Sequence, residues 1–266
     1  MRYEGNIRKM RSELDNSVDY YLPIGTDEIH MNKLIGRNIK ISYSGIINCV
    51  SCSAKTKTSF HQGHCYSCFT SLPQCDVGIL RPEQDMSHEG ISRDLEWAKK
   101  NSLVDHAVYI AITGGVKVGV TRFTQIPTRW IDQGAIKAIV LAKTPHRNLA
   151  GQIEVFLKDY IADKTNWSKM LKTKVADINL VEIKNELSSK LPEDLKMYLS
   201  FNNKITKVNY PDKYEIDKFS SKSLDKENIV EGKLVGIKGQ YLIFESGNVI
   251  NIRKHNGYFV SLETTE

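Results

Sequence analysis

The chain has 266 residues, of which 41% are apolar and 26% charged, and its formal net charge is +6. This mixture is typical of a protein with a hydrophobic core, and it excludes collagen-like and wholly disordered classes. Because no apolar run approaches about 20 residues and residues 1–30 lack the apolar stretch of a secretory signal, we expect a cytoplasmic protein that does not span a membrane.

Residues 1–48 are predicted to form a small β-rich segment. The stretches Val18–Ile24 and Asn38–Ile47 are rich in Tyr, Ile and Val, and Gly and Asn residues separate them. Short runs of such residues bounded by turn formers are typical of β-strands.

Residues 49–92 form a cysteine-rich module. Four of its cysteines follow the spacing C-x2-C-x12-C-x2-C: Cys49, Cys52, Cys65 and Cys68. Two such pairs supply the tetrahedral set of thiolates that zinc prefers, and four protein ligands leave no open position on the metal. The spacing therefore predicts a structural zinc ion in a knuckle or ribbon, and the alternative is four ordinary buried or redox cysteines.

Other residues of this module have open roles. A histidine near the cysteines (His61, His64 or His88) could replace one of them as a ligand, or Cys75 and His88 could take part in a further cluster. The alternative is that His61 and His64 are loop residues and Cys75 is a small core or rim residue. Cations and aromatic residues also alternate here, and this mixture suits either nucleic-acid binding or packing around a metal. They are Lys55, Lys57, Phe60, Tyr66 and Phe69.

Residues 93–175 are predicted to form an α/β core. A helix is expected over 92–101 with Ser92 as its N-cap, and two strands are expected on either side of the turn signal Gly114-Gly115. The expected strands are His106–Thr113, Val116–Thr121 and Ala138–Ala142, and the expected helices that follow them are Pro127–Gln133 and Leu149–Ala162. The last helix is apolar around most of its circumference, which predicts extensive burial.

The rest of the chain completes an α+β fold. Residues 176–224 are predicted to hold helices and a linker, with Pro192 starting a second helix. Residues 225–266 alternate apolar and polar residues between glycines, the pattern of an antiparallel meander, which could pack with the N-terminal strands. Between Val116 and Lys174 there are eleven Lys or Arg and four acids, a surplus compatible with a polyanionic partner or with a solvated basic face.

Residues 106–166 resemble the GIY-YIG nuclease superfamily. The resemblance lies in V-Y-I-A at 108–111, in K-V-G-V-T-R at 117–122, and in the later Arg129 and Glu154. In that superfamily two strands carry paired tripeptides, one helix carries an arginine and a later helix carries a metal-binding glutamate. The resemblance implies a nuclease-like fold over this part of the chain.

The resemblance also implies roles for individual residues. Tyr109 would orient or activate water, Arg129 would hold a phosphate, and Glu154 would bind Mg²⁺ or Mn²⁺. The candidate substrate-binding residues are Gly119, Arg122 and Asn166.

One residue departs from the superfamily pattern. Lys117 stands where the second tripeptide usually has a tyrosine, so Lys117 is the candidate base, although a lysine serves as a base only when its pKa is strongly lowered. His146 is the alternative. The sequence thus leaves open whether the chain is an enzyme.

Most of residues 1–175 also resembles an uncharacterised bacterial family. The carrying stretches are 55–69 and 117–135, in which a knuckle precedes the segment K-V-G-V-T-R-F-T-Q-I-P-T-R-W-I-D-Q-G-A. Members often have further Cys and His between 75 and 93, where this chain has Asp85, His88 and Ser92, so a second metal site is not expected. Our leading hypothesis is a zinc-containing protein that engages DNA or RNA as a divalent-metal-dependent endonuclease. The alternatives are a non-catalytic nucleic-acid-binding protein and a protein-interaction scaffold.

Overall fold

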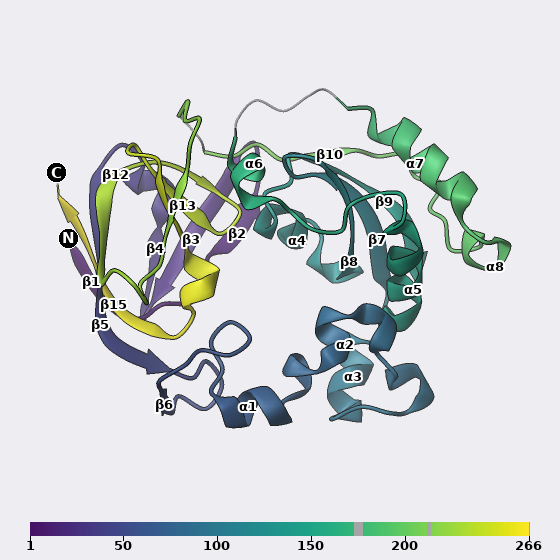
Figure 1. Ribbon diagram of the computed structural model, residues 1–266, viewed down its shortest axis with the longest axis horizontal. Helices are drawn as coiled ribbons and strands as arrows, with labels where there is room; N and C mark the ends of the chain where they lie inside the picture. The colour runs from purple at the N-terminus through teal and green to yellow at the C-terminus, as the bar shows by residue number, and fades with distance from the viewer. Residues whose placement is uncertain (173–177, 212–213, 266) are drawn as a thin grey trace. The chain divides into compact units, whose positions relative to one another are not determined.

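A computed structural model describes residues 1–172, 178–211 and 214–265. It confirms the α+β class, with a β-rich N-terminal part, a cysteine cluster and antiparallel strands near the C-terminus (Figure 1). The chain forms two compact units, here called unit 1 (residues 1–70 and 209–266) and unit 2 (residues 71–208). The predicted boundary between the α/β core and the helical segment, at residues 175 and 176, and the basic residue Lys174 lie outside the described residues.

Unit 1 contains two sheets. In the larger one the strand order is β1, β15, β5, β12, β13, β14 and β11, and the short β6 also pairs with β5. The strands of this sheet are β1 (Arg2–Asn6), β5 (Asn38–Asn48), β6 (Lys55–Thr56), β11 (Ser220–Lys222), β12 (Ile229–Lys238), β13 (Tyr241–Phe244), β14 (Asn248–Asn251) and β15 (Tyr258–Thr265). The smaller sheet holds β2 (Arg11–Leu14), β3 (Val18–Ile24) and β4 (Asp27–His30), and two 3₁₀-helices complete the unit, η1 (Met31–Leu34) and η6 (Ile252–His255).

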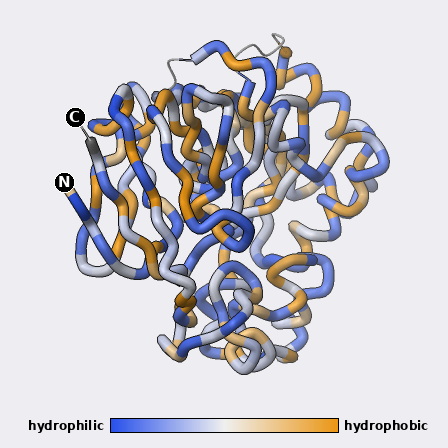
Figure 2. The backbone as a smooth tube through the Cα atoms, turned by 60° about the vertical axis from the view of Figure 1, so that its left-hand side comes forward, coloured by the Kyte–Doolittle hydropathy of each residue, from blue (hydrophilic) through white to orange (hydrophobic). Residues whose placement is uncertain are grey.

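The C-terminal meander packs with the N-terminal strands, as its alternating pattern suggested. Strand β5 pairs antiparallel with both β12 and β15, so residues from the two ends of the chain share one sheet. Alternation of buried and less buried residues is regular along β3, and Figure 2 shows hydrophobic and hydrophilic stretches alternating along the tube. Alternate side chains of a strand point to opposite faces, so β3 buries one row of side chains, whereas β13 is buried on both faces.

Unit 2 is built on an antiparallel sheet with the order β10, β9, β7, β8. These strands are β7 (His106–Ile112), β8 (Val116–Arg122), β9 (Lys137–Thr144) and β10 (Thr206–Lys207). The helices are α2 (Val77–Leu80), α3 (Leu95–Asn101), α4 (Thr128–Asp132), α5 (Arg147–Leu157), α6 (Trp167–Leu171), α7 (Leu180–Lys190) and α8 (Glu193–Lys196), and α1 (Tyr66–Ser71) lies where the units join along the chain. The 3₁₀-helices are η2 (Pro73–Cys75), η3 (Pro82–Gln84), η4 (Ser87–Glu89) and η5 (Phe123–Gln125).

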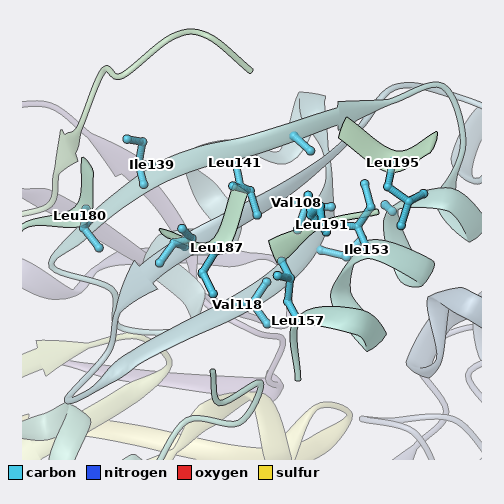
Figure 3. Packing of buried hydrophobic residues seen from close by; sticks show 14 of the residues in the cluster. Val108, Val118, Ile139, Leu141, Ile153, Leu157, Leu180, Leu187, Leu191 and Leu195 are labelled. Carbon is cyan, nitrogen blue, oxygen red and sulfur yellow. The ribbon is translucent and has the colours of Figure 1, made fainter. Parts of the chain in front are cut away.

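The two faces of the unit 2 sheet differ in chemistry. Alternate residues of β7 and β8, among them Val108 and Val118, join the main core with Ile153 and Leu157 of α5 and with residues of α7 (Figure 3). The opposite face carries Tyr109, which packs with Trp130 of α4 and with three alanines. The second face is therefore the one on which polar side chains of β7 and β8 gather.

Two helices differ from their predicted bounds. The helix expected over 149–162 begins at Arg147, because the His146 ring accepts a hydrogen bond from the backbone N–H of Leu149, and it ends at Leu157. Only one side of it is buried, since Val155 is 41% exposed. The N-cap of α3 is Asp94 rather than Ser92, because the Asp94 carboxylate accepts from the Trp97 N–H at 2.9 Å.

Candidate metal centre and candidate active site

The four predicted zinc ligands meet in unit 1, where the chain leaves β5. The sulfurs of Cys49, Cys52, Cys65 and Cys68 all lie within 4.8 Å of one another. The Sγ atoms of Cys52 and Cys65 are 3.8 Å apart, which matches the edge of a tetrahedron built with metal–sulfur bonds of about 2.3 Å. The cluster can therefore hold a structural metal ion with the coordination that zinc prefers.

Tight backbone turns hold the two cysteine pairs. The N–H of Ser53 donates to the Cys49 carbonyl at 3.0 Å, and the N–H of Val50 donates to the Gly63 carbonyl at 2.8 Å, which ties the first pair to the loop before the second. Gly63 has a φ of +120°, and a Cβ there would lie 2.3 Å from the Val50 side chain. Only glycine fits this crossing, because it tolerates positive φ and needs no room for a side chain.

Two thiols of the cluster, those of Cys49 and Cys68, differ in how readily they ionise when no metal is bound. Burial opposes ionisation of Cys49, but backbone N–H groups of Cys52, Cys65 and Ser51 outweigh burial and lower its pKa to about 6. Desolvation and hydrogen bonds with the other three thiols raise the pKa of Cys68 to about 12. Four thiolates this close repel one another, so the full set needs the charge of a bound cation.

The remaining cysteine and the histidines lie outside this cluster. Cys75 is buried in η2 of unit 2. His61 is a loop residue with a φ of +40°, and the Nδ1 atom of the buried His64 lies 3.1 Å from the His61 carbonyl. His88 stacks on His146, with 4.7 Å between ring centroids. Within the described ranges, the four predicted cysteines form the one group of three or more potential metal ligands.

A second group of side chains gathers in unit 2 on the Tyr109 face of the sheet. Tyr109 is fully buried, and the amide of Gln133, at the end of α4, lies between it and Arg129. With the amide oriented to satisfy both its atoms, its nitrogen donates to the Tyr109 hydroxyl at 2.7 Å and its oxygen accepts from Arg129 Nε at 3.2 Å. Gln133 thus couples the position of the arginine to that of the tyrosine.

Lys117 and Glu154 belong to the same electrostatic group. Lys117 is 5% exposed, and burial, reinforced by the positive charge of Arg129, lowers its pKa to about 8 although Glu154 and Asp163 oppose the shift. Burial also raises the pKa of Glu154 against the opposing charges of Lys158 and Lys117, and burial raises the pKa of Tyr109 against Arg129. The structure therefore brings together all four residues predicted to be catalytic: Tyr109, Lys117, Arg129 and Glu154.

Gly119 lies directly opposite Tyr109 in the β7–β8 ladder. A Cβ at this position would lie 2.6 Å from the Tyr109 hydroxyl and 2.7 Å from the ring carbon that carries it. The glycine therefore makes room for the tyrosine ring, and its absence of a side chain fixes where that ring lies.

The other two predicted substrate-binding residues have local partners. The guanidinium of Arg122, at the end of β8, donates to the side-chain oxygen of Asn101. Asn166 is exposed and caps α6 by accepting from the N–H of Lys169 at 3.1 Å. The Arg122 contact lies at the end of β8, whereas the Asn166 contact lies at the start of α6.

Sequence reasoning missed two members of the polar group, Gln133 and Asp163. Gln133 is four residues after Arg129, a spacing that places two residues on the same side of a helix and could have indicated it. Asp163 forms an ion pair with Lys158 at 3.4 Å, and its charge also acts on Lys117 because the segment after α5 pairs in parallel with β8, where the N–H of Val118 donates to the Ala162 carbonyl at 2.8 Å. No local pattern signals that pairing, since it depends on tertiary packing.

Comparison with known proteins gives a family. Residues 36–260 match the model of a family described as protein of unknown function, DUF2797. The chain belongs to the DUF2797 family. The match covers most of both units and confirms the resemblance to an uncharacterised family. No curated protein and no solved structure matches the chain.

None of the helices in the described ranges combines the length and the apolar character needed to cross a bilayer.

Proposed function

We propose that this DUF2797 protein is a zinc-containing nucleic-acid-binding protein whose unit 2 hydrolyses phosphodiester bonds. The observation that carries the proposal is the convergence of Tyr109, Lys117, Arg129 and Glu154 on β7, β8, α4 and α5, with Gln133 joining two of them. A buried amine with a lowered pKa can act as a base in phosphodiester hydrolysis, and a guanidinium and a metal-binding carboxylate can stabilise its charge.

Arg129 and Glu154 are the half-buried groups that can bind a phosphate and a cation. Arg129 is half-buried, so its outer guanidinium nitrogen can bind a phosphate while its inner edge stays on Gln133. Glu154 is also half-buried and offers a carboxylate for a divalent cation. One carboxylate, with Asp163 nearby, fits Mg²⁺ or Mn²⁺, because Mg²⁺ keeps several waters and shares phosphate oxygens. The cation would supply charge stabilisation on the phosphate.

Lys117 acts as the base in this proposal. With a pKa of about 8, roughly a tenth of its amines are neutral at pH 7, whereas almost none would be at the ordinary value. The neutral amine accepts a proton from the attacking water, the new P–O bond forms, and the bond to the leaving oxygen breaks. The leaving oxygen takes a proton from solvent.

Tyr109 is a positioning residue in this scheme. Its side chain is fully buried and its raised pKa keeps the phenol protonated, so it supports Gln133 and through it Arg129. This role differs from the one that the superfamily resemblance implies.

A second candidate function is nucleic-acid binding without cleavage. The observation that favours it is the burial of Tyr109 and Lys117, which are 0% and 5% exposed. In that case Arg129 binds a phosphate and no water reaches Lys117.

The test is cleavage of supercoiled plasmid and end-labelled RNA with Mg²⁺ or Mn²⁺. We expect Glu154→Gln to lower the rate at least ~100-fold, as loss of one charge-stabilising group typically does. Glu186→Gln, an exposed glutamate of α7, is the matched control and should keep the full rate. Cleavage that persists in Glu154→Gln would overturn the proposed site, and salt-sensitive binding without cleavage by the wild type would select the second candidate.

A further inference from the structure

Three aromatic rings gather beside the cysteine cluster of unit 1. The ring centroids of Phe60 and Phe69 are 5.7 Å apart and stacked, and those of Phe60 and Tyr66 are 5.5 Å apart with the edge of one toward the other. None of the three is buried, and Tyr66 is 65% exposed. Most aromatic residues in a fold are largely buried, so an exposed ring supported by two others resembles a contact platform rather than a core.

The segment that carries these rings and a second segment hydrogen-bonded to it contain no acidic residue. No Asp or Glu occurs between Glu28 and Asp76, nor between Glu245 and Glu263. The two segments lie together, because Arg253 donates to the side-chain oxygen of Gln62 and the Asn256 amide donates to the Gln62 carbonyl at 3.0 Å. In Figure 1, the loop that precedes the second cysteine pair runs between β6 and α1.

The charge balance of this region is positive. Four cations lie on β6, the loop after it and η6, which the contacts with Gln62 bring together: Lys55, Lys57, Arg253 and Lys254. Four thiolates around one divalent zinc carry a net charge of −2, so the region keeps a surplus of two positive charges when the metal is bound. The lysines at 55, 57 and 254 are on flexible stems that can reach an anion several ångströms away.

We infer that this face, defined by Tyr66, Phe60, Phe69 and the four cations and here called the aromatic–basic face, binds single-stranded nucleic acid. A base stacks on the exposed ring of Tyr66, and the lysines and Arg253 contact the neighbouring phosphates. Base–aromatic stacking of this kind is tolerant of sequence and is combined with cations along the backbone in proteins that bind single strands. The inference deepens the proposed function by naming the class of nucleic acid.

The geometry favours an unpaired strand over a duplex. In a duplex the base faces are covered by neighbouring bases, so a ring presented on the surface finds no face to stack on. It also favours nucleic acid over an acidic polypeptide, because an acidic peptide would use the cations and leave the ring without a partner.

The test measures binding by fluorescence anisotropy, with the full chain loaded with zinc and without added Mg²⁺. The probes are a labelled 20-nucleotide single strand of DNA, the same sequence in RNA, and the matching duplex. We expect Tyr66→Ala to weaken single-strand binding roughly tenfold, since one lost stack corresponds to about 1–3 kcal/mol. Tyr66→Phe keeps a ring and should bind as the wild type does. Tyr160→Ala, which removes another exposed tyrosine, is the matched control.

Zinc content and thermal unfolding of each variant show whether the module is intact. If Tyr66→Ala is unstable, Lys57→Gln gives a second test, because loss of one phosphate contact should lower the slope of log affinity against log salt by about 0.7. Equal affinity in wild type and Tyr66→Ala, tighter binding to duplex than to single strand, or equal competition by polyglutamate would each overturn the inference.

These outcomes are independent of the cleavage test. Loss of cleavage in Glu154→Gln with unchanged single-strand affinity supports the site of unit 2 alone. Loss of affinity in Tyr66→Ala supports the aromatic–basic face even if the wild type does not cleave.

Discussion

The cysteine cluster of unit 1 and the polar group of unit 2 gather their side chains in different ways. The cysteines lie in two close pairs on tight loops, and only Cys49 of the four is buried. The polar group draws Tyr109, Lys117, Arg129 and Glu154 from four elements that a hydrophobic core holds in place. A metal held by the four thiolates would order the first region, whereas packing orders the second.

This difference explains which parts could be predicted. Short-range spacing was sufficient for the zinc ligands, because a C-x2-C pair needs only a tight turn to point both thiolates at one ion. The four catalytic candidates came from a resemblance, and the structure places them together. Gln133 could have been found from its spacing to Arg129, whereas Asp163 could not, because its position depends on the pairing of the segment after α5 with β8.

The fold was predictable to a similar extent. Strands with period-two burial, such as β3, and the hairpin at Gly114-Gly115 follow from local sequence. The early end of α5 and its His146 cap did not, since an apolar sequence continues past Leu157 and histidine is an uncommon cap. Pairing of β5 with β12 and β15 could only be suggested, because register across such a distance depends on tertiary contacts.

The largest effect is expected from breaking the cysteine cluster of unit 1. Replacing Cys65 by Ser should abolish stoichiometric zinc binding and unfold residues 49–70, because structural zinc contributes on the order of 10 kcal/mol to small modules of this kind. Metal analysis and hydrogen exchange measure the two effects. Cys75→Ser is the control, since Cys75 lies outside the cluster, and it should retain one zinc per chain. Full zinc content and exchange protection in Cys65→Ser would contradict the assignment.

The next largest effect concerns the buried amine of Lys117, in the polar group of unit 2. The folded pKa of Lys117 is about 8 against an ordinary value of 10.5, so the unfolded chain holds more protons between these values. The free energy of unfolding should therefore rise with pH across this window, by about 3 kcal/mol from this group. The measurement is urea unfolding of wild type and Lys117→Met at pH 7.5 and 10, in which only the wild type should show this gain.

Removal of an exposed lysine provides the comparison for that experiment. Lys100 lies on α3 and is exposed, so Lys100→Met should follow the wild type at both pH values. Identical pH dependence in wild type and Lys117→Met would mean that Lys117 is not held in a desolvated position.

The smallest effect tests how closely the polar group is packed. Gly119→Ala should lower the free energy of unfolding by about 1–3 kcal/mol, because the added methyl group would overlap the buried Tyr109 ring. Gly115→Ala in the adjacent turn meets no atom within 4 Å and should be neutral or slightly stabilising. Chemical denaturation compares the two variants, and equal stability would show that the Tyr109 ring is free to move aside.

The pairing of β1 with β15 and of β5 with β12 has a consequence for biosynthesis. Unit 2 is one continuous stretch of chain placed between the two segments of unit 1. During translation its sheet is complete while β1 and β5 still lack the neighbours that are encoded last. The large sheet of unit 1 can therefore be completed only after synthesis passes residue 258, and until then β1 and β5 keep unpaired edges that could pair with other strands.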